Sequence, residues 1–139
     1  MKFLGFNFTK MSAERQKDFV KDLKINTNMD ISSIEKTDSD FFKGNEELLV
    51  VKFKYFLDYS PELAKIHFEG NILISEEQKI AKEVLKGWKN KELPETFRLN
   101  ILNLILRKCN FKAIQLEEEL NLPFHISFPS ISLNKDKDK

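Results

Sequence analysis

The side chains best suited to chemistry in this sequence include two isolated histidines. His67 alternates with Lys65 and Glu69, so we expect an exposed cross-strand residue rather than a catalytic one. His125 is separated from His67 by two predicted helices and has no obvious acidic partner in the sequence. Neither histidine therefore predicts a site for general acid–base catalysis.

Cys109 and the consecutive glutamates 117–119 are the other candidates. Cys109 lies among apolar residues, where a free cysteine usually behaves as a small buried hydrophobe. Consecutive glutamates point in different directions around a helix, so we expect these three to be solubilising. The sequence has no glycine-rich phosphate loop, no nucleophile elbow and no Cys or His spacing suited to zinc. It therefore predicts no catalytic residue, no metal site and no cofactor.

The composition is that of a chain with little net charge and one thiol. The 139 residues include 23 Lys and Arg and 22 Asp and Glu, and their interspersed signs disfavour nucleic acid and anionic membranes as partners. A single cysteine excludes an internal disulfide and fits a reducing compartment. No extended apolar stretch follows a basic start, and no later run approaches about 18 apolar residues. We expect a cytoplasmic protein without direct membrane insertion.

The length predicts one domain, which we place at residues 1–131, followed by a polar disordered tail at residues 132–139. This domain contains an unusually large number of phenylalanines, 13 in all. A bulky core is one explanation of that number. A surface that binds apolar partners is the other.

Alternating apolar residues predict four strands, at residues 2–9, 23–34, 48–60 and 64–74. The segment 11–23 has apolar residues at helical spacing but too few to settle its structure, so we treat it as a crossover. Gly44 and Asn45 mark a turn, which predicts a hairpin of the second and third strands with a long connection. Gly70 indicates a bulge or the close approach of another group.

Two helices are expected after the strands. Residues 75–78, SEEQ, have the spacing of a capping box, so we expect the first helix to start there and to bury a stripe ending at Trp88. Pro94 is suited to the first turn of the second helix, which we expect to continue past a kink near Asn110.

The second helix is apolar over a wide arc. At 100° per residue its apolar positions between residues 97 and 109 span roughly 220°, whereas a helix on one sheet needs a stripe of about 100°. The excess predicts a second contact, most economically with another subunit. We therefore expect a homo-oligomer with these interface residues: Phe97, Ile101, Leu102, Ile105 and Leu106.

Residues 120–131, LNLPFHISFPSI, are unusual near a C-terminus. Half of them are aliphatic or Phe, yet Pro123 and Pro129 disfavour a helix and a central strand. A disordered tail would be polar. This segment must therefore be covered by its own chain or by a partner.

The order of these segments resembles the SecB family of protein-export chaperones over residues 3–131. The strand LKINTN, the stretch FEGNILISEEQ, the helix LPETFRLNILNLI and the Pro-punctuated apolar end are similar to family segments. The resemblance implies an α+β fold, a four-stranded antiparallel sheet with two C-terminal helices packed on one face. It also implies a homotetramer formed as a dimer of dimers, which holds unfolded polypeptide in hydrophobic grooves without ATP, catalysis or a cofactor.

In the family, the groove is bordered by the crossover after the first strand and by the C-terminal segment. The resemblance implies that the client-binding residues here are Met11, Phe19, Val20, Leu23, Phe124 and Phe128. The stretch LPFHISFP would then form one wall of the groove, where backbone groups stay free to pair with an extended client.

This chain departs from the family in charge. Bacterial members are strongly acidic, and their acidic surface docks the export motor SecA, whereas this chain is nearly neutral. A divergent homologue that controls one dedicated client, like relatives associated with toxin and antitoxin pairs, fits the sequence equally well. Three function classes stay open: a chaperone for unfolded or preprotein polypeptides, a non-catalytic oligomeric adaptor or scaffold without a free groove, and a small-molecule binder or enzyme.

Overall fold

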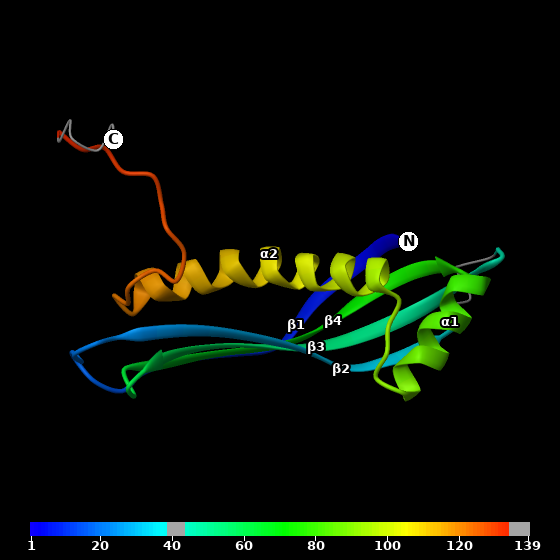
Figure 1. The fold of residues 1–139 in the computed structure, drawn as a ribbon, viewed down its shortest axis with the longest axis horizontal. Coiled ribbons are helices and arrows are strands. Elements are labelled where there is room, and N and C mark those ends of the chain that lie inside the picture. The colour runs from blue at the N-terminus through cyan, green and yellow to red at the C-terminus, as the bar shows by residue number, and fades with distance from the viewer. Residues whose placement is uncertain (39–43, 134–139) are drawn as a thin grey trace.

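Four strands and two helices make up the fold (Figure 1). The structure is a computed structural model and describes residues 1–38 and 44–133, so Gly44 and Asn45 are described but most of the connection before them is not. The predicted polar tail, apart from residues 132 and 133, also lies outside the described residues. The elements are β1 (Lys2–Arg15), β2 (Lys24–Thr37), β3 (Glu46–Ser60), β4 (Ala64–Glu77), α1 (Gln78–Lys89) and α2 (Glu95–Glu119).

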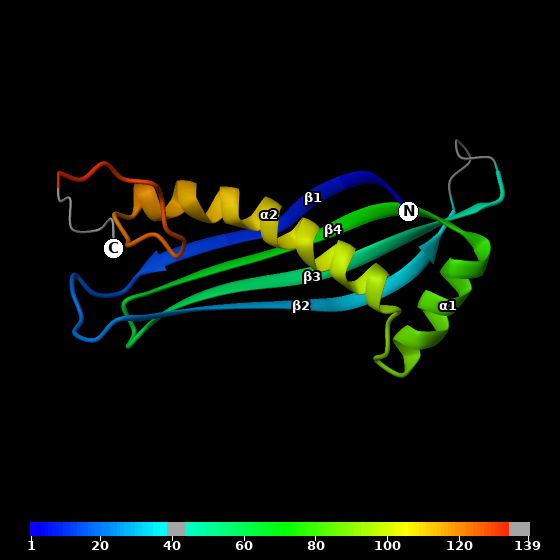
Figure 2. The same cartoon turned by 45° about the horizontal axis from the view of Figure 1, so that its top comes forward.

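The strands form one antiparallel sheet in the order β1-β4-β3-β2. The predicted hairpin of the second and third strands is confirmed, since β2 and β3 pair from Lys24 opposite Ser60 to Thr37 opposite Leu48. β1 and β2 are the edges of this sheet. The helix α2 crosses one face of the sheet and α1 packs at its end, while the described helices leave the other face uncovered (Figure 2). The predicted α+β fold is confirmed.

The core lies between the sheet and α2. Alternate residues of β3 and β4 are buried because successive side chains of a strand point to opposite faces of the sheet. Tyr55 and Tyr59 are among the most deeply buried side chains. The buried residues of the two central strands on the face toward α2 are Leu49, Val51, Phe53, Tyr55, Leu57, Tyr59, Ala64, Ile66, Phe68, Ile72 and Ile74.

The buried side of α2 winds around the helix. Every fourth residue is buried, in the order Phe97, Ile101, Ile105, Cys109, Ala113 and Glu117. At 100° per residue, a step of four moves the buried position by about 40°, which reaches about 200° over this length. Between Phe97 and Cys109, where the wide apolar arc was predicted, this shift is about 120°, so a contact line that turns around the helix as it crosses the twisted sheet accounts for part of the arc (Figure 2). Leu99, Leu102 and Leu106 lie off this line and are exposed or half-buried. The arc alone does not require a second subunit, and oligomer formation stays a prediction.

Three local predictions are corrected by the structure. The first strand does not stop at residue 9 but runs to Arg15, because the long strand β4 gives residues 10–15 partners up to Ala64. The capping box is wrong: Ser75 is still paired in β4, its hydroxyl donates to Glu46, and α1 begins at Gln78 without a side-chain cap. The kink near residue 110 is absent, since α2 is continuous.

Gly70 allows the close approach that the sequence indicated. It lies opposite Phe8, directly before a register shift in β1. A Cβ atom at Gly70 would collide with the carbonyl oxygen of Asn7 and would lie 2.6 Å from Cζ of Phe53. Only glycine fits here without displacing the edge strand or the core.

Candidate functional site

Arg15, the last residue of β1, joins the crossover to the end of α2. Its Nη1 donates to the carbonyl oxygens of Leu120 (2.9 Å) and Asn121 (2.7 Å). Its Nε and Nη2 donate to the carbonyl oxygens of Lys17 (2.9 Å) and Asp18 (2.5 Å). The guanidinium holds five N–H donors in a rigid fork, so one side chain can fix two segments that are about a hundred positions apart.

The end of α2 turns the chain back toward the sheet. Asn121 has a positive φ of 53°, and the N–H of Leu122 donates to the carbonyl oxygen of Glu117 at 2.8 Å. This left-handed residue and the six-to-one hydrogen bond are those of a Schellman motif, and asparagine tolerates its conformation well. The motif buries Leu122 and starts the C-terminal segment beside the crossover.

Two neighbouring hollows lie along the path that Arg15 bridges. The larger, about 390 Å³, lies between the crossover and the C-terminal segment and is lined by Arg15, Asp18, Phe19, Val20, Leu23, Leu63, Asn121, Leu122 and Pro123. The smaller, about 250 Å³, lies between β1 and α2 and is lined by Met11, Ser12, Ala13, Leu116, Glu119 and Leu120. We call the two hollows together the crossover groove.

The structure brings four of the six predicted groove residues to these hollows. Phe19, Val20 and Leu23 line the larger one and Met11 the smaller one. Phe19 is 73% exposed, although a side chain of its kind is usually buried. The other two predicted residues, Phe124 and Phe128, do not line either hollow. Their rings meet edge to face in the C-terminal segment, with ring centroids 5.0 Å apart, and the two residues are 40% and 49% exposed.

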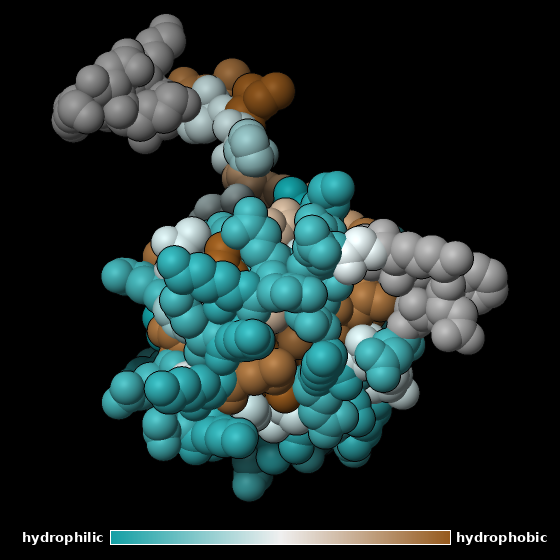
Figure 3. All heavy atoms as spheres, turned by 90° about the vertical axis from the view of Figure 1, so that its right-hand side faces the viewer, coloured by the Kyte–Doolittle hydropathy of each residue, from teal (hydrophilic) through white to brown (hydrophobic). Residues whose placement is uncertain are grey.

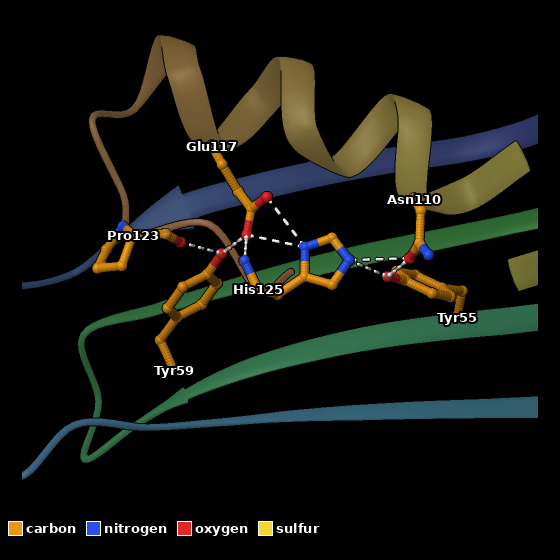
Figure 4. Close-up of polar contacts among 6 residues, drawn as sticks. All are labelled: Tyr55, Tyr59, Asn110, Glu117, Pro123 and His125. Atoms are coloured by element: carbon orange, nitrogen blue, oxygen red, sulfur yellow. Dashed lines mark hydrogen bonds and ion pairs between the residues drawn. The ribbon is translucent and has the colours of Figure 1, made fainter. Parts of the chain in front are cut away.

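A buried polar cluster holds the C-terminal segment in place (Figure 4). The carboxylate of Glu117 is fully buried and accepts from the hydroxyl of Tyr59 and from the backbone N–H of His125 at 2.9 Å. Nδ1 of the same histidine lies 3.0 Å from Oε1 of the carboxylate. The hydroxyl of Tyr59 also lies 3.1 Å from the carbonyl oxygen of Pro123. Because a buried carboxylate is costly unless it is hydrogen-bonded, these donors explain how Glu117 is tolerated.

The other ring nitrogen of His125 reaches the middle of α2. Its Nε2 lies 2.8 Å from Oδ1 of Asn110, which also accepts from the hydroxyl of Tyr55 at 3.1 Å. Burial raises the pKa of Tyr55 and Tyr59 far above the ordinary value, and the hydrogen bond to Glu117 adds to this for Tyr59. Both phenols therefore keep their protons at neutral pH and act as donors. The side chains of Tyr55, Tyr59, Glu117 and His125 are buried, so the cluster pins a segment rather than offering a place for a substrate.

This cluster was not predicted from the sequence. No acidic partner for His125 was apparent and residues 117–119 were expected to be solubilising, but Glu117 is buried and contacts His125, while Glu118 and Glu119 are exposed. One signal was present in the sequence. The buried positions of α2 recur every four residues from Phe97, and continuing that series arrives at Glu117.

The remaining candidates for chemistry have ordinary surroundings. His67 lies on the helix-free face of the sheet and stacks on Phe56, with centroids 4.4 Å apart. Burial and the charge of Lys10 lower its pKa, so it is neutral at pH 7. Burial raises the pKa of the Cys109 thiol to about 12, which leaves it unreactive. In the described part of the chain, no three His, Cys, Asp or Glu side chains are arranged to hold a metal ion.

The predicted interface residues fall into two groups. Phe97, Ile101 and Ile105 are buried within the chain itself, so they are not available to another subunit in this conformation. Leu102 and Leu106 are only half-buried. No helix among the described residues is both long and apolar enough to cross a membrane.

Comparison with known proteins gives a likeness of fold. No protein-family model and no curated protein matches this sequence. The structure is similar to that of a SecB-like chaperone of Mycobacterium tuberculosis, solved in complex with a ChAD peptide from the HigA1 antitoxin. The TM-score is 0.56, the match covers 96% of this chain and 91% of that chain, and 9% of the residues are identical. The fold is therefore SecB-like.

Proposed function

We propose that the protein is an ATP-independent chaperone that holds unfolded or extended polypeptides in the crossover groove. The observation that carries the proposal is the meeting of two distant apolar segments. Phe19, Val20 and Leu23 lie across from Leu122 and Pro123, and the hollow between them is open to solvent at the exposed ring of Phe19. Exposed apolar surface of this kind is typical of sites that bind other polypeptides.

The groove offers backbone contacts as well as apolar ones. β1 borders the smaller hollow and is an edge strand, so one side of its backbone is not paired within the described sheet. An extended client can add to such an edge, where main-chain hydrogen bonds give affinity that depends little on sequence. Its apolar side chains then fill the hollows. Neither contact requires nucleotide, catalysis or a cofactor.

The solved SecB-like chaperone supports this proposal, because a protein of the same fold has a peptide bound. We propose that the clients here are preproteins or one dedicated client. The low net charge favours a dedicated client over handover to an export motor that docks on an acidic surface. We also propose that the protein works in the cytoplasm as a homo-oligomer, most simply a tetramer built as a dimer of dimers.

An oligomeric adaptor or scaffold is the second candidate. The observation that favours it is the outer side of α2, where Leu99 is 46% and Phe111 67% exposed. Large apolar side chains in such positions are typical of interfaces between proteins. In this alternative the exposed aromatics are covered by other subunits, and no groove is left for a client.

An aggregation assay separates the two candidates. The purified chain is added without ATP to a chemically unfolded substrate at near-equal molar ratio. The chaperone proposal predicts that aggregation is suppressed and that the same substrate, once folded, does not bind. An adaptor leaves aggregation unchanged.

A further inference from the structure

A third hollow lies at the opposite end of α2, beside the edge strand β2. Its volume is about 480 Å³, and we call it the corner hollow. Figure 3 shows this end of the molecule, where apolar residues are visible among hydrophilic ones. Four consecutive residues of β2 line it, together with the corner between the helices and the first turns of α2: Met29, Asp30, Ile31, Ser32, Trp88, Lys91, Leu93, Arg98 and Leu102.

The lining combines an apolar floor with two cations. Lys91 and Arg98 have no carboxylate partner in an ion pair among the described residues. Asp30 is the only acid in the lining. Its neighbours Met29 and Ile31 lie opposite Tyr55 and Phe53 of β3, whose side chains are buried toward α2, so Met29 and Ile31 are on the face toward α2 as well. Asp30 therefore lies on the opposite face, next to Lys54. On the side of the helices, the hollow is positively charged.

The turn between α1 and α2, which carries Lys91, is fixed by a hydrogen bond and a close backbone approach between Gly87 and Glu92. The N–H of Glu92 donates to the carbonyl oxygen of Gly87 at 2.8 Å, and a Cβ atom at Gly87 would collide with the carbonyl oxygen of Glu92. Lys91 is one of four described non-glycine residues with a positive φ, here 60°, at a helix end where glycine is usual. This conformation places its Nζ 4.0 Å from the ring centroid of Trp88. A lysine is thus held in an unfavourable conformation above an aromatic ring.

We propose that the corner hollow binds an extended polypeptide segment that carries an acidic side chain two residues from an apolar one. The segment pairs with the free edge of β2, which orients alternate side chains toward the hollow. The apolar side chain packs against Trp88 and Leu102, and the carboxylate meets Lys91 and Arg98. This inference extends the client-binding proposal to a second position on the molecule, and it rests on that proposal.

Trp88 provides the test, because it is the single tryptophan of the chain. The full-length protein is titrated with the peptide acetyl-Thr-Val-Thr-Phe-Thr-Glu-Thr-Val-amide while Trp88 fluorescence is recorded. The matched peptide has Gln in place of Glu. We expect the Glu peptide to change the emission and the Gln peptide to bind about tenfold more weakly, with the difference shrinking at high salt. Equal affinities, or no change in emission with either peptide, overturn the inference.

Two variants and a control locate the carboxylate contact. In Lys91→Gly the backbone conformation becomes easier, so the protein stays folded, yet the preference for the Glu peptide falls. Arg98→Gln has the same effect on the preference. Lys89→Gln, an exposed change at the end of α1 outside the hollow, leaves it intact. If Lys91→Gly and Arg98→Gln both keep the full preference for the Glu peptide, the carboxylate does not bind at Lys91 and Arg98, and the inference is wrong. The aggregation assay decides the chaperone proposal separately, because it needs no acidic residue in the substrate.

Discussion

His125 Nδ1 lies 3.0 Å from Oε1 of Glu117, a contact buried on both sides that ties the C-terminal segment to α2. It holds in place the start of the C-terminal segment, whose residues Asn121, Leu122 and Pro123 line the larger hollow beside the crossover. Further along the chain, the side chains of Ile131 and Leu133 are fully or almost fully exposed. The geometry of the crossover groove therefore depends on this pair and on Arg15.

Removing the histidine should be costly. His125→Ala leaves the buried carboxylate of Glu117 without one of its donors, so we expect a loss of about 3–5 kcal/mol in the free energy of unfolding. Urea denaturation measures it. The exposed change Glu118→Gln serves as the control and should cost less than about 0.5 kcal/mol. The double variant His125→Leu with Glu117→Met should lose less than the single variant, because no unpaired charge remains. A single variant as stable as the wild type contradicts this role of the pair.

A glycine pair on two neighbouring strands tests the packing of β1. Gly70→Ala forces a methyl group against Asn7 and Phe53, and we expect it to destabilise the protein by about 1–3 kcal/mol. At Gly5 an added Cβ would meet only the Cβ of Leu73, at 3.9 Å. Gly5→Ala should therefore be neutral within about 0.5 kcal/mol. Thermal unfolding of both variants checks the contrast, and similar melting temperatures would show that β1 is placed differently.

His67 predicts a pH dependence of stability. Burial and the charges of Lys10 and Lys54 lower its pKa in the folded protein below the ordinary value of 6.5, although Glu69 acts in the opposite sense. The folded state thus binds this proton more weakly than the unfolded state. The contribution of His67 to the free energy of unfolding is complete above the pKa of the unfolded state and is lost as the pH falls toward the pKa of the folded state.

The measurement compares the wild type with His67→Gln, so that contributions from other groups cancel. The free energy of unfolding of the wild type, relative to that of the variant, should fall between about pH 7.5 and about pH 5. A difference that stays constant or rises as the pH falls would place the histidine in other surroundings.

The strands could be predicted because their pattern is local. In β3 and β4 the alternation of buried residues is almost uninterrupted, and it sets both the strands and their inner face. Local signals failed where distant partners decide the structure. Ser75 does not cap a helix because strand pairing continues to Glu77 opposite Glu46, and α1 begins only at Gln78.

The site was predictable only in part for the same reason. The pattern and the family resemblance pointed to the crossover and the C-terminal segment, but not to the side chains that fix them. Arg15 binds carbonyl oxygens more than a hundred positions away, and nothing near it in the sequence indicates these acceptors. Glu117 looked like part of a charged surface, because its partners Tyr59 and His125 meet it only in the folded chain.

Oligomer formation is tested at Leu106, which is half-buried in the single chain. Wild-type protein at micromolar concentration should scatter light as a multiple of the 16.4 kDa chain. Leu106→Asp should shift it toward the monomer, because an unpaired charge in an apolar interface costs several kcal/mol. Asn103→Asp, an exposed change on the same helix, should keep the wild-type mass. A wild-type protein that is already a monomer rules out this interface.

The most direct test of the chaperone account is client holding by groove variants. Phe19→Ser removes an exposed ring from a wall of the groove, and Phe128→Ser removes one from the C-terminal segment beside the groove. The control, Phe111→Ser, removes an exposed ring on α2 outside both hollows. Suppression of aggregation is measured without ATP for all three variants at matched oligomer mass. We predict that the first two hold an unfolded substrate about fivefold more weakly and that the third holds it like the wild type. Equal holding by all four proteins, or no holding by the wild type, would contradict the account.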